Sequence, residues 1–223
     1  MEIPAYTIFQ VAGNDAAAAY KLMPQQTAQG VPPHWMAYVA VASADETAGK
    51  AAGLGGTVVV PPMDVTELGR MAVIRDPQGA HFAIWQPKMH PGHTHGDANW
   101  RHCWTELATS DTAAAKAFYT SLFGWGTHEQ DMGGMMYTSF LNAGRPVGGM
   151  MAMPAEMAGA PPFWMLYFSV ENCQESADKA AAMGGVVCQP PTPIPGVGTF
   201  SMIADPQGAN FSIIQLAMAA QGS

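Results

Sequence analysis

The chain has 223 residues, a formal net charge of −8, and 48% hydrophobic against 12% charged residues. This composition excludes a disordered chain, which combines low hydrophobicity with high net charge. Because the chain has only 9 Lys and Arg, it lacks the basic surface that a nucleic-acid partner requires.

Membrane and secretion signals are also missing from the sequence. No apolar run approaches the length of about 18 residues that a membrane helix needs. The start, Met1 to Pro4, has no basic segment followed by an apolar one, so no signal peptide is expected. The cysteines, Cys103, Cys173 and Cys188, show no CxxC spacing, which argues against a disulfide framework or a thiolate zinc site. We therefore expect a cytoplasmic protein with reduced thiols.

The sequence contains an internal repeat. Residues 76–80 and 205–209 both read Asp-Pro-Gln-Gly-Ala, 129 residues apart. The same spacing relates further pairs: Trp35 and Trp164, Val41 and Val170, Gly55-Gly56 and Gly184-Gly185, and Pro61-Pro62 and Pro190-Pro191. Agreement at so many positions in one register predicts two related units. The paired prolines are predicted to fix turns.

The two units differ in length. We place the first at residues 1–88 and the second at 102–218, with a linker rich in Pro and Gly at 89–101. Nothing before Tyr6 corresponds to the opening of the second unit. The first unit is therefore expected to be N-terminally incomplete, without an opening strand and helix.

The second unit shows its elements most clearly. A strand at 103–109 precedes a helix at 113–123, for which Asp111 is a plausible N-cap and Gly124 a stop. A second helix at 176–183 ends at a Gly-Gly pair. The remaining strands are expected at 137–141, 147–153, 165–170, 186–188, 199–203 and 210–216. This order favours an α+β fold over a regularly alternating α/β sheet.

The pattern resembles the vicinal-oxygen-chelate superfamily, which includes glyoxalase I, extradiol dioxygenases and bleomycin-resistance proteins. The resemblance rests on Phe-Tyr-x-x-Leu-Phe-Gly-Trp at 118–125, the repeated Asp-Pro-Gln-Gly and the Gly-Gly pairs. Trp-Thr-Glu-Leu at 104–107 is similar to a two-domain, glyoxalase-like branch. The resemblance implies tandem units of paired βαβββ modules, whose curved sheets form cups around a small molecule or a metal.

The resemblance also implies positions for metal ligands. In the second unit these fall on Trp104, Met165 and Ser212, and in the first unit on Met36 and Ala83. Such side chains do not hold a hard divalent cation, which needs carboxylate, imidazole or carbonyl donors. We therefore predict no cofactor, and no metal at the family position.

Two histidines offer an alternative in the first unit. Strand alternation puts His34, Met36 and Tyr38 on one inward face, and His81 on a parallel neighbouring strand. One hypothesis makes His34 and His81 a displaced site for Zn²⁺, Fe²⁺ or Mn²⁺, or an acid–base pair. The other hypothesis makes them polar residues at the mouth of the cup.

Glu106 is the main catalytic candidate of the second unit. Alternation places it on the inward face of its strand with Trp104 and His102. A carboxylate inside an apolar cup is suited to act as a general acid or base. The competing interpretation is a hydrogen-bonded, structural glutamate.

The leading functional hypothesis is binding of a small apolar or aromatic molecule without turnover, as in bleomycin-resistance proteins. The expected ligand contacts are Met36, Tyr38, Trp104, Met165, Tyr167, Asn210 and Ser212. One alternative is a lyase, isomerase or dioxygenase that uses displaced ligands or Glu106 as base. Another is a truncated copy without activity. The open sheet edge of the incomplete unit predicts a homodimer.

Overall fold

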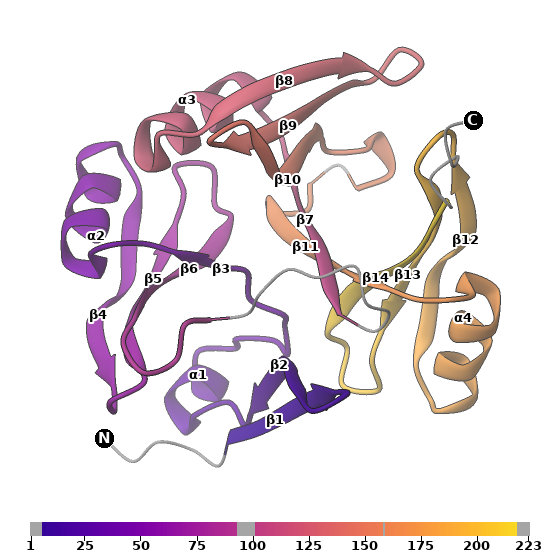
Figure 1. Cartoon of the computed structure of the whole chain (residues 1–223), viewed down its shortest axis with the longest axis horizontal. Coiled ribbons are helices and arrows are strands. Elements are labelled where there is room, and N and C mark those ends of the chain that lie inside the picture. Colours follow the sequence, from indigo (N-terminus) through magenta and orange to yellow (C-terminus); the bar gives the residue numbers. More distant parts are fainter. Residues whose placement is uncertain (1–5, 93–100, 158, 218–223) are drawn as a thin grey trace. The chain divides into compact units, whose positions relative to one another are not determined.

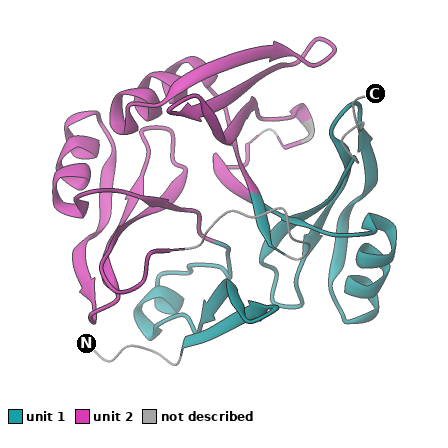
Figure 2. Ribbon diagram, viewed as in Figure 1, with its two compact units in different colours: residues 1–35, 93–103, 166–223 teal, residues 36–92, 104–165 magenta. Residues whose placement is uncertain are grey.

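The computed structural model describes residues 6–92, 101–157 and 159–217 (Figure 1). The fold is mixed α+β and consists mostly of strands. The chain divides into two compact units, and each is made of separate segments (Figure 2). Unit 1 comprises residues 1–35, 93–103 and 166–223, and unit 2 comprises residues 36–92 and 104–165. The predicted linker at 89–101 lies partly outside the described residues.

The first segment of unit 2 forms a four-stranded sheet with one helix. Its elements are β3 (Tyr38–Ala40), α2 (Ala44–Gly53), β4 (Thr57–Val65), β5 (Gly69–Arg75) and β6 (His81–Pro87). The strand order is β3-β6-β5-β4, and β3 runs parallel to β6, as the sequence predicted. The hydroxyl of Ser43 accepts a hydrogen bond from the Glu46 N–H at 3.2 Å and so caps α2.

The second segment of unit 2 repeats this order of elements. It contains β7 (His102–Thr109), α3 (Thr112–Phe123), β8 (Gly126–Asp131), β9 (Met136–Asn142) and β10 (Arg145–Ala152). The strand order is β7-β10-β9-β8, with β7 parallel to β10. The carboxylate of Asp111 caps α3, and Gly124 ends it in the left-handed conformation (φ 72°), as predicted.

The core of unit 2 is aromatic. The buried rings of Phe82, Phe118, Tyr119 and Phe140 come from both of its segments. The ring centroids of Phe82 and Tyr119 lie 5.5 Å apart, and those of Tyr119 and Phe140 lie 5.8 Å apart. The first contact is tilted and the second is edge-to-face, and both add to the free energy gained by burying large apolar areas.

The Asp-Pro-Gln-Gly motif builds a turn that belongs to this core. Asp76 Oδ1 accepts hydrogen bonds from the N–H groups of Gln78, Gly79 and Ala80 at 2.8–2.9 Å. Its Oδ2 accepts the buried hydroxyl of Tyr119 at 2.9 Å. In unit 1, Asp205 Oδ1 accepts the N–H groups of two residues of its own copy. The motif therefore has a structural role, because its carboxylate accepts the backbone N–H groups of its own turn.

Unit 1 contains the last quarter of the chain, residues 166–223. Strand β11 (Phe163–Ser169) enters it from unit 2, and α4 (Cys173–Ala182), β12 (Val186–Ile194), β13 (Gly198–Ala204) and β14 (Asn210–Leu216) follow. The strand order is β12-β13-β14-β11, with β11 parallel to β14. Its small core packs against α4.

The N-terminal segment also belongs to unit 1. Strands β1 (Tyr6–Val11) and β2 (Asn14–Tyr20) form a two-stranded antiparallel sheet, and the short helix α1 (Pro24–Ala28) follows. A single 3₁₀ turn, η1 (Ala155–Met157), follows β10. None of the helices in the described ranges is long and apolar enough to cross a membrane.

The prediction that the paired prolines fix turns is wrong. Pro61-Pro62 lies inside β4 and Pro190-Pro191 inside β12, at the points where the pairing register shifts. Each of these strands lies at one edge of its sheet. Prolines are tolerated at such positions because an edge strand has N–H groups that no neighbour needs, and they discourage pairing with another chain.

The strand expected to carry His34, Met36 and Tyr38 is also shorter than predicted. In the structure β3 begins at Tyr38, so His34 and Met36 lie before it. Pro32 and Pro33 lack the N–H groups that a ladder requires, so the strand could not extend back through them.

Candidate functional site

The sheet β7-β10-β9-β8 has two chemically different faces. Leu107 and Thr109 are fully buried, and Leu107 lies in the core cluster beside α3. Since side chains alternate along a strand, Trp104 and Glu106 lie on the opposite face of β7. Both are half-buried. Their shared hydrogen-bond partner, the Tyr137 hydroxyl, also puts them on one face.

A chain of hydrogen bonds crosses this second face. The indole Nε1 of Trp104 donates to the hydroxyl of Tyr137 at 2.8 Å, and that hydroxyl donates to Glu106 Oε2 at 2.8 Å. Tyr137 thus uses its oxygen as acceptor and its proton as donor. The Trp104–Tyr137–Glu106 chain links two aromatic rings to one carboxylate, on strands β7 and β9.

Gly149 of β10 makes this arrangement fit. It lies directly opposite Glu106 on β7 and opposite Ser139 on β9. A Cβ atom built on Gly149 would lie 1.8 Å from the Tyr137 hydroxyl oxygen and 3.0 Å from Trp104 Nε1. Only a residue without a side chain leaves room for both rings.

Sequence reasoning did not assign Tyr137 or Gly149 to the site. Period-two alternation in the predicted strand 137–141 could have put Tyr137 on one face, but not on the face of Glu106. That assignment needs the pairing of β9 with β10 and of β10 with β7. The pair Gly148-Gly149 within a strand was the available signal, since glycine there marks a close approach.

The predicted histidine pair is divided between the units. His34 is exposed in unit 1, where its Nδ1 lies 2.8 Å from the Pro32 carbonyl oxygen. His81 is exposed at the start of β6 in unit 2. Tyr38 of β3 is directly opposite Ala83 of β6, and its side chain is 49% exposed. A displaced metal site or acid–base pair at His34 and His81 stays a prediction.

The predicted ligand contacts near the C-terminus lie on β11 and β14. Tyr167 is directly opposite Ser212, and both side chains are buried. Met165 is buried two residues earlier on β11, while Asn210 is exposed at the start of β14. Met36 is half-buried, before β3.

Within residues 6–92, 101–157 and 159–217, no three His, Cys, Asp or Glu side chains gather into a group that could hold a metal ion. The indole nitrogen of Trp104 is a donor only and carries no free lone pair for a cation. Glu106 supplies the carboxylate of the Trp104–Tyr137–Glu106 chain.

Cys103, the residue before Trp104, is half-buried. Its Sγ donates to the Tyr167 carbonyl oxygen at 3.5 Å. Burial raises the pKa of the Cys103 thiol to about 11. A thiol of this pKa is almost wholly protonated at neutral pH, so little of the reactive thiolate is expected there.

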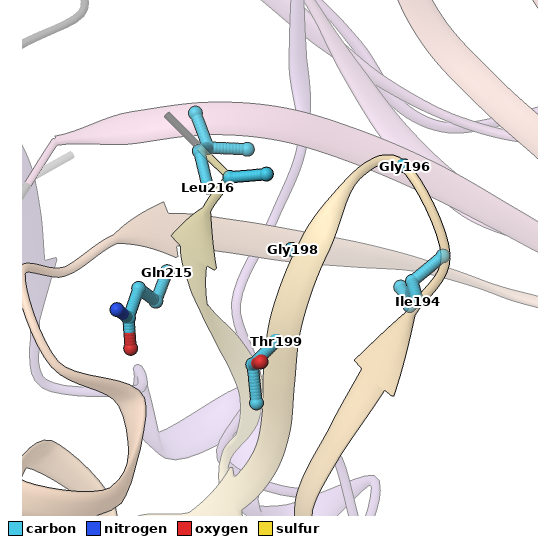
Figure 3. Close-up of a pocket in the computed structure, with 7 residues that line it drawn as sticks. Ile194, Gly196, Gly198, Thr199, Gln215 and Leu216 are labelled. Carbon is cyan, nitrogen blue, oxygen red and sulfur yellow. The ribbon is translucent and has the colours of Figure 1, made fainter. Parts of the chain in front are cut away.

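Two open pockets lie elsewhere. One of about 400 Å³ is at the end of the unit 1 sheet (Figure 3), where it is lined by Ile194, Gly196, Gly198, Thr199, Gln215, Leu216 and Ala217. The other, of about 240 Å³, lies in unit 2 and includes Val39, Thr47 and Trp125. None of the predicted site residues lines either pocket.

Comparisons with known proteins agree on the family. Residues 102–213 match the Glyoxalase/Bleomycin resistance protein/Dioxygenase superfamily. A Mycobacterium tuberculosis protein named "Putative glyoxylase CFP32" is 38% identical over 202 residues, which cover 90% of this chain and 77% of that protein. The anthracycline biosynthesis protein DauV of Streptomyces sp. (strain C5) is 33% identical, over 86% of this chain and 70% of its own.

Solved structures share the fold. The Mn(II)-bound glyoxalase from Novosphingobium aromaticivorans matches with a TM-score of 0.56 and 15% identity, over 80% of this chain and 61% of that chain. A homoprotocatechuate 2,3-dioxygenase variant from B. fuscum matches with a TM-score of 0.52 and 14% identity, over 80% and 54%. This chain spans less than two thirds of either. At such identities the likeness concerns the fold alone.

Proposed function

Because the chain belongs to the Glyoxalase/Bleomycin resistance protein/Dioxygenase superfamily, we propose that it binds a small aromatic molecule at the Trp104–Tyr137–Glu106 chain. Binding takes place without a metal ion at the family position. The observation that carries this proposal is the pair of hydrogen bonds that fixes two half-buried aromatic rings beside a carboxylate.

The site chemistry favours an aromatic ligand with a hydroxyl group. Indole and phenol rings bind flat ligands by stacking and by the burial of apolar area. The Glu106 carboxylate accepts hydrogen bonds, and a phenolic hydroxyl of the ligand would donate one to it. Two relatives named anthracycline biosynthesis proteins are consistent with an aromatic ligand.

The contacts of Trp104 support binding without metal. On the family resemblance, the first metal ligand falls on this residue. Its Nε1–H is engaged with Tyr137 at 2.8 Å, and an indole has no lone pair to offer. Met165 and Ser212, at the other two family positions, supply a thioether and a hydroxyl, which hold hard divalent cations poorly.

A second candidate function is metal-independent proton transfer by Glu106. The observation in its favour is that Tyr137 holds Oε2 at 2.8 Å, because a general base needs a partner that orients it. In that case Glu106 would take a proton from an acidic O–H or C–H group of the ligand and return it to another atom. Trp104 and Tyr137 would hold the ring.

We also propose that the chain consists of the two related units that the sequence indicates. Sequence units at 1–88 and 102–218, joined by 89–101, are supported by a shared strand–helix–three-strand order. That order recurs in β3 to β6, β7 to β10 and β11 to β14. Identical burial patterns along β4 and β12 also support it.

Ligand binding by the purified chain tests the proposal. The probes are a tetracyclic anthracyclinone and catechol, followed by fluorescence titration and by the shift in melting temperature. We expect binding that Glu106→Gln weakens about tenfold, while Glu129→Gln on the opposite face of the sheet leaves it unchanged. Wild-type affinity in both Glu106→Gln and Trp104→Leu would refute the site.

The same variants separate binding from turnover and from metal use. Product formation from catechol or from the anthracyclinone that stops in Glu106→Gln would favour the second candidate function. Stoichiometric Mn²⁺ or Zn²⁺ in the untagged protein, lost on replacing Glu106, His34 or His81, would overturn metal-free binding.

A further inference from the structure

A row of small and polar residues crosses the sheet from Glu106 to its edge strand. Glu106 of β7 is directly opposite Gly149 of β10, and Gly149 is opposite Ser139 of β9. Ser139 is in turn opposite His128 of β8. Directly opposite residues of neighbouring strands share a face, so these four positions form one continuous line, the Glu106–His128 row.

An ion pair confirms which face His128 occupies. Glu129, the next residue of β8, pairs with Lys116 of α3, with Nζ and Oε1 2.8 Å apart. Glu129 therefore faces the helix. Because successive side chains of a strand point to opposite faces, His128 points to the face that carries Glu106.

The two middle residues of the row, Gly149 and Ser139, have no side chain or a small one, so neither residue itself contributes a large group to the row. The Tyr137 hydroxyl and Trp104 Nε1 occupy the space over Gly149, next to Glu106. Tyr137 covers the Gly149 end, where its hydroxyl approaches the backbone. His128 is exposed on the edge strand. Three strand spacings of about 4.8 Å give the row a length of roughly 14 Å, which exceeds a single aromatic ring.

The two ends of the row offer different chemistry. Glu106 accepts hydrogen bonds, whereas the His128 imidazole and the Ser139 hydroxyl both donate and accept. An elongated planar ligand could rest over Ser139 with its edge against Trp104 and Tyr137. A phenolic hydroxyl would then meet Glu106, and a quinone or carbonyl oxygen would meet His128.

We infer that Ser139 and His128 form a second, distal part of the ligand site, and that the ligand class is a polycyclic aromatic with oxygen substituents at both ends. This inference rests on the proposed function, because it extends the same site along the sheet. It assigns specificity for ligand length to two residues outside the Trp104–Tyr137–Glu106 chain.

A comparison of a long and a short probe tests the inference. The variants are His128→Ala, which removes the distal hydrogen-bonding group, and Ser139→Phe, which fills the row. We expect each to weaken binding of the tetracyclic anthracyclinone about tenfold and to leave catechol binding unchanged. Glu106→Gln is expected to weaken both probes. Glu129→Gln, on the same strand but facing α3, is the matched control.

The possible failures are distinguishable. If His128→Ala and Ser139→Phe bind the anthracyclinone like the wild type while Glu106→Gln loses it, the distal site is wrong and the proposed function stands. If Glu106→Gln and Trp104→Leu also bind both probes normally, or if the wild type binds neither, the proposed function fails and the distal site with it. Far-UV circular dichroism checks that Ser139→Phe folds, and His128→Ala decides the question if it does not.

Discussion

Gly149 lies so close to Tyr137 that a Cβ atom on it would be 1.8 Å from the phenolic oxygen. No hydroxyl can approach a carbon atom so closely, so the hydrogen bonds of Tyr137 to Trp104 and Glu106 depend on this glycine. The backbone of β10 is therefore part of the site.

Gly149→Ala should displace the Tyr137 ring and break both of its hydrogen bonds. We expect a loss of about 1–3 kcal/mol in the free energy of unfolding, together with loss of ligand binding. Urea unfolding and probe titration measure the two effects. Gly49→Ala is the matched control: nothing lies within 4 Å of a Cβ there, and α2 should gain about 0.5–1 kcal/mol. Unaltered binding by Gly149→Ala would show that Tyr137 does not act in the site.

The two copies of Asp-Pro-Gln-Gly should differ in what their aspartates contribute. Asp76 accepts three backbone N–H groups and the Tyr119 hydroxyl, and that hydroxyl accepts Trp164 Nε1–H at 3.0 Å. Asn at position 76 would turn an amide N–H₂ group toward one of these donors. We expect Asp76→Asn to cost about 3 kcal/mol and Asp205→Asn about 1 kcal/mol in urea unfolding. Equal losses would contradict a special role for the Asp76 network.

Tyr119 also predicts how stability changes in alkali. Burial, and then the charge of Asp76, raise the pKa of Tyr119 well above its ordinary value of about 10. Above that pH the unfolded chain loses the Tyr119 proton while the folded chain keeps it, so stability falls as pH rises. Tyr119→Phe should be less stable at neutral pH but should lose less between about pH 9 and pH 11. Parallel curves for the two proteins would contradict the assignment.

The sequence could predict features that depend on local pattern, but not those that depend on the pairing of distant strands. The side chains of Trp104 and Glu106 lie two residues apart on one strand, and alternation alone placed them together. Asp111 and Gly124 marked the ends of α3 by cap chemistry that acts within one turn. These local rules, with the family resemblance, gave the α+β class and most of the elements of the second unit.

Local rules could not predict that Tyr137 contacts Glu106. It meets Glu106 because β10 lies between β9 and β7 and sets the register for both. That order comes from core packing of residues far apart in sequence, such as Phe140 against Tyr119. The predicted strand placement of His34 is wrong, because β3 begins at Tyr38. The two prolines directly before His34 were a visible local sign against a strand there.

The cysteines should differ in reactivity toward a thiol reagent. Cys188 is exposed, whereas burial raises the pKa of Cys173 and raises the pKa of Cys103 to about 11. At neutral pH we expect one fast-reacting thiol, which Cys188→Ser removes. The slow reaction of Cys103 should accelerate about tenfold per pH unit below its pKa, because only the thiolate attacks. Fast labelling of Cys103 at neutral pH, identified by peptide mass mapping, would contradict its burial.

We expect the protein to self-associate through the outer edge of β3. In the order β3-β6-β5-β4, no further strand among the described residues pairs with the outer side of β3. Val41 donates its N–H to Trp85 of β6, and Ala37 accepts from Ala83. Alternate residues of a parallel strand direct their backbone groups to opposite edges, so the N–H of Ala40 points away from β6.

We therefore expect a homodimer in which β3 edges pair, with twice the chain mass in light scattering at micromolar concentration. Ala40→Pro should shift the protein to monomer while sparing every bond to β6, because proline removes only the outward N–H. Val39→Pro, which removes a donor facing β6, should instead lower the melting temperature. A wild-type protein that is monomeric at micromolar concentration would exclude this dimer, and a dimer that Ala40→Pro leaves intact would place the interface elsewhere.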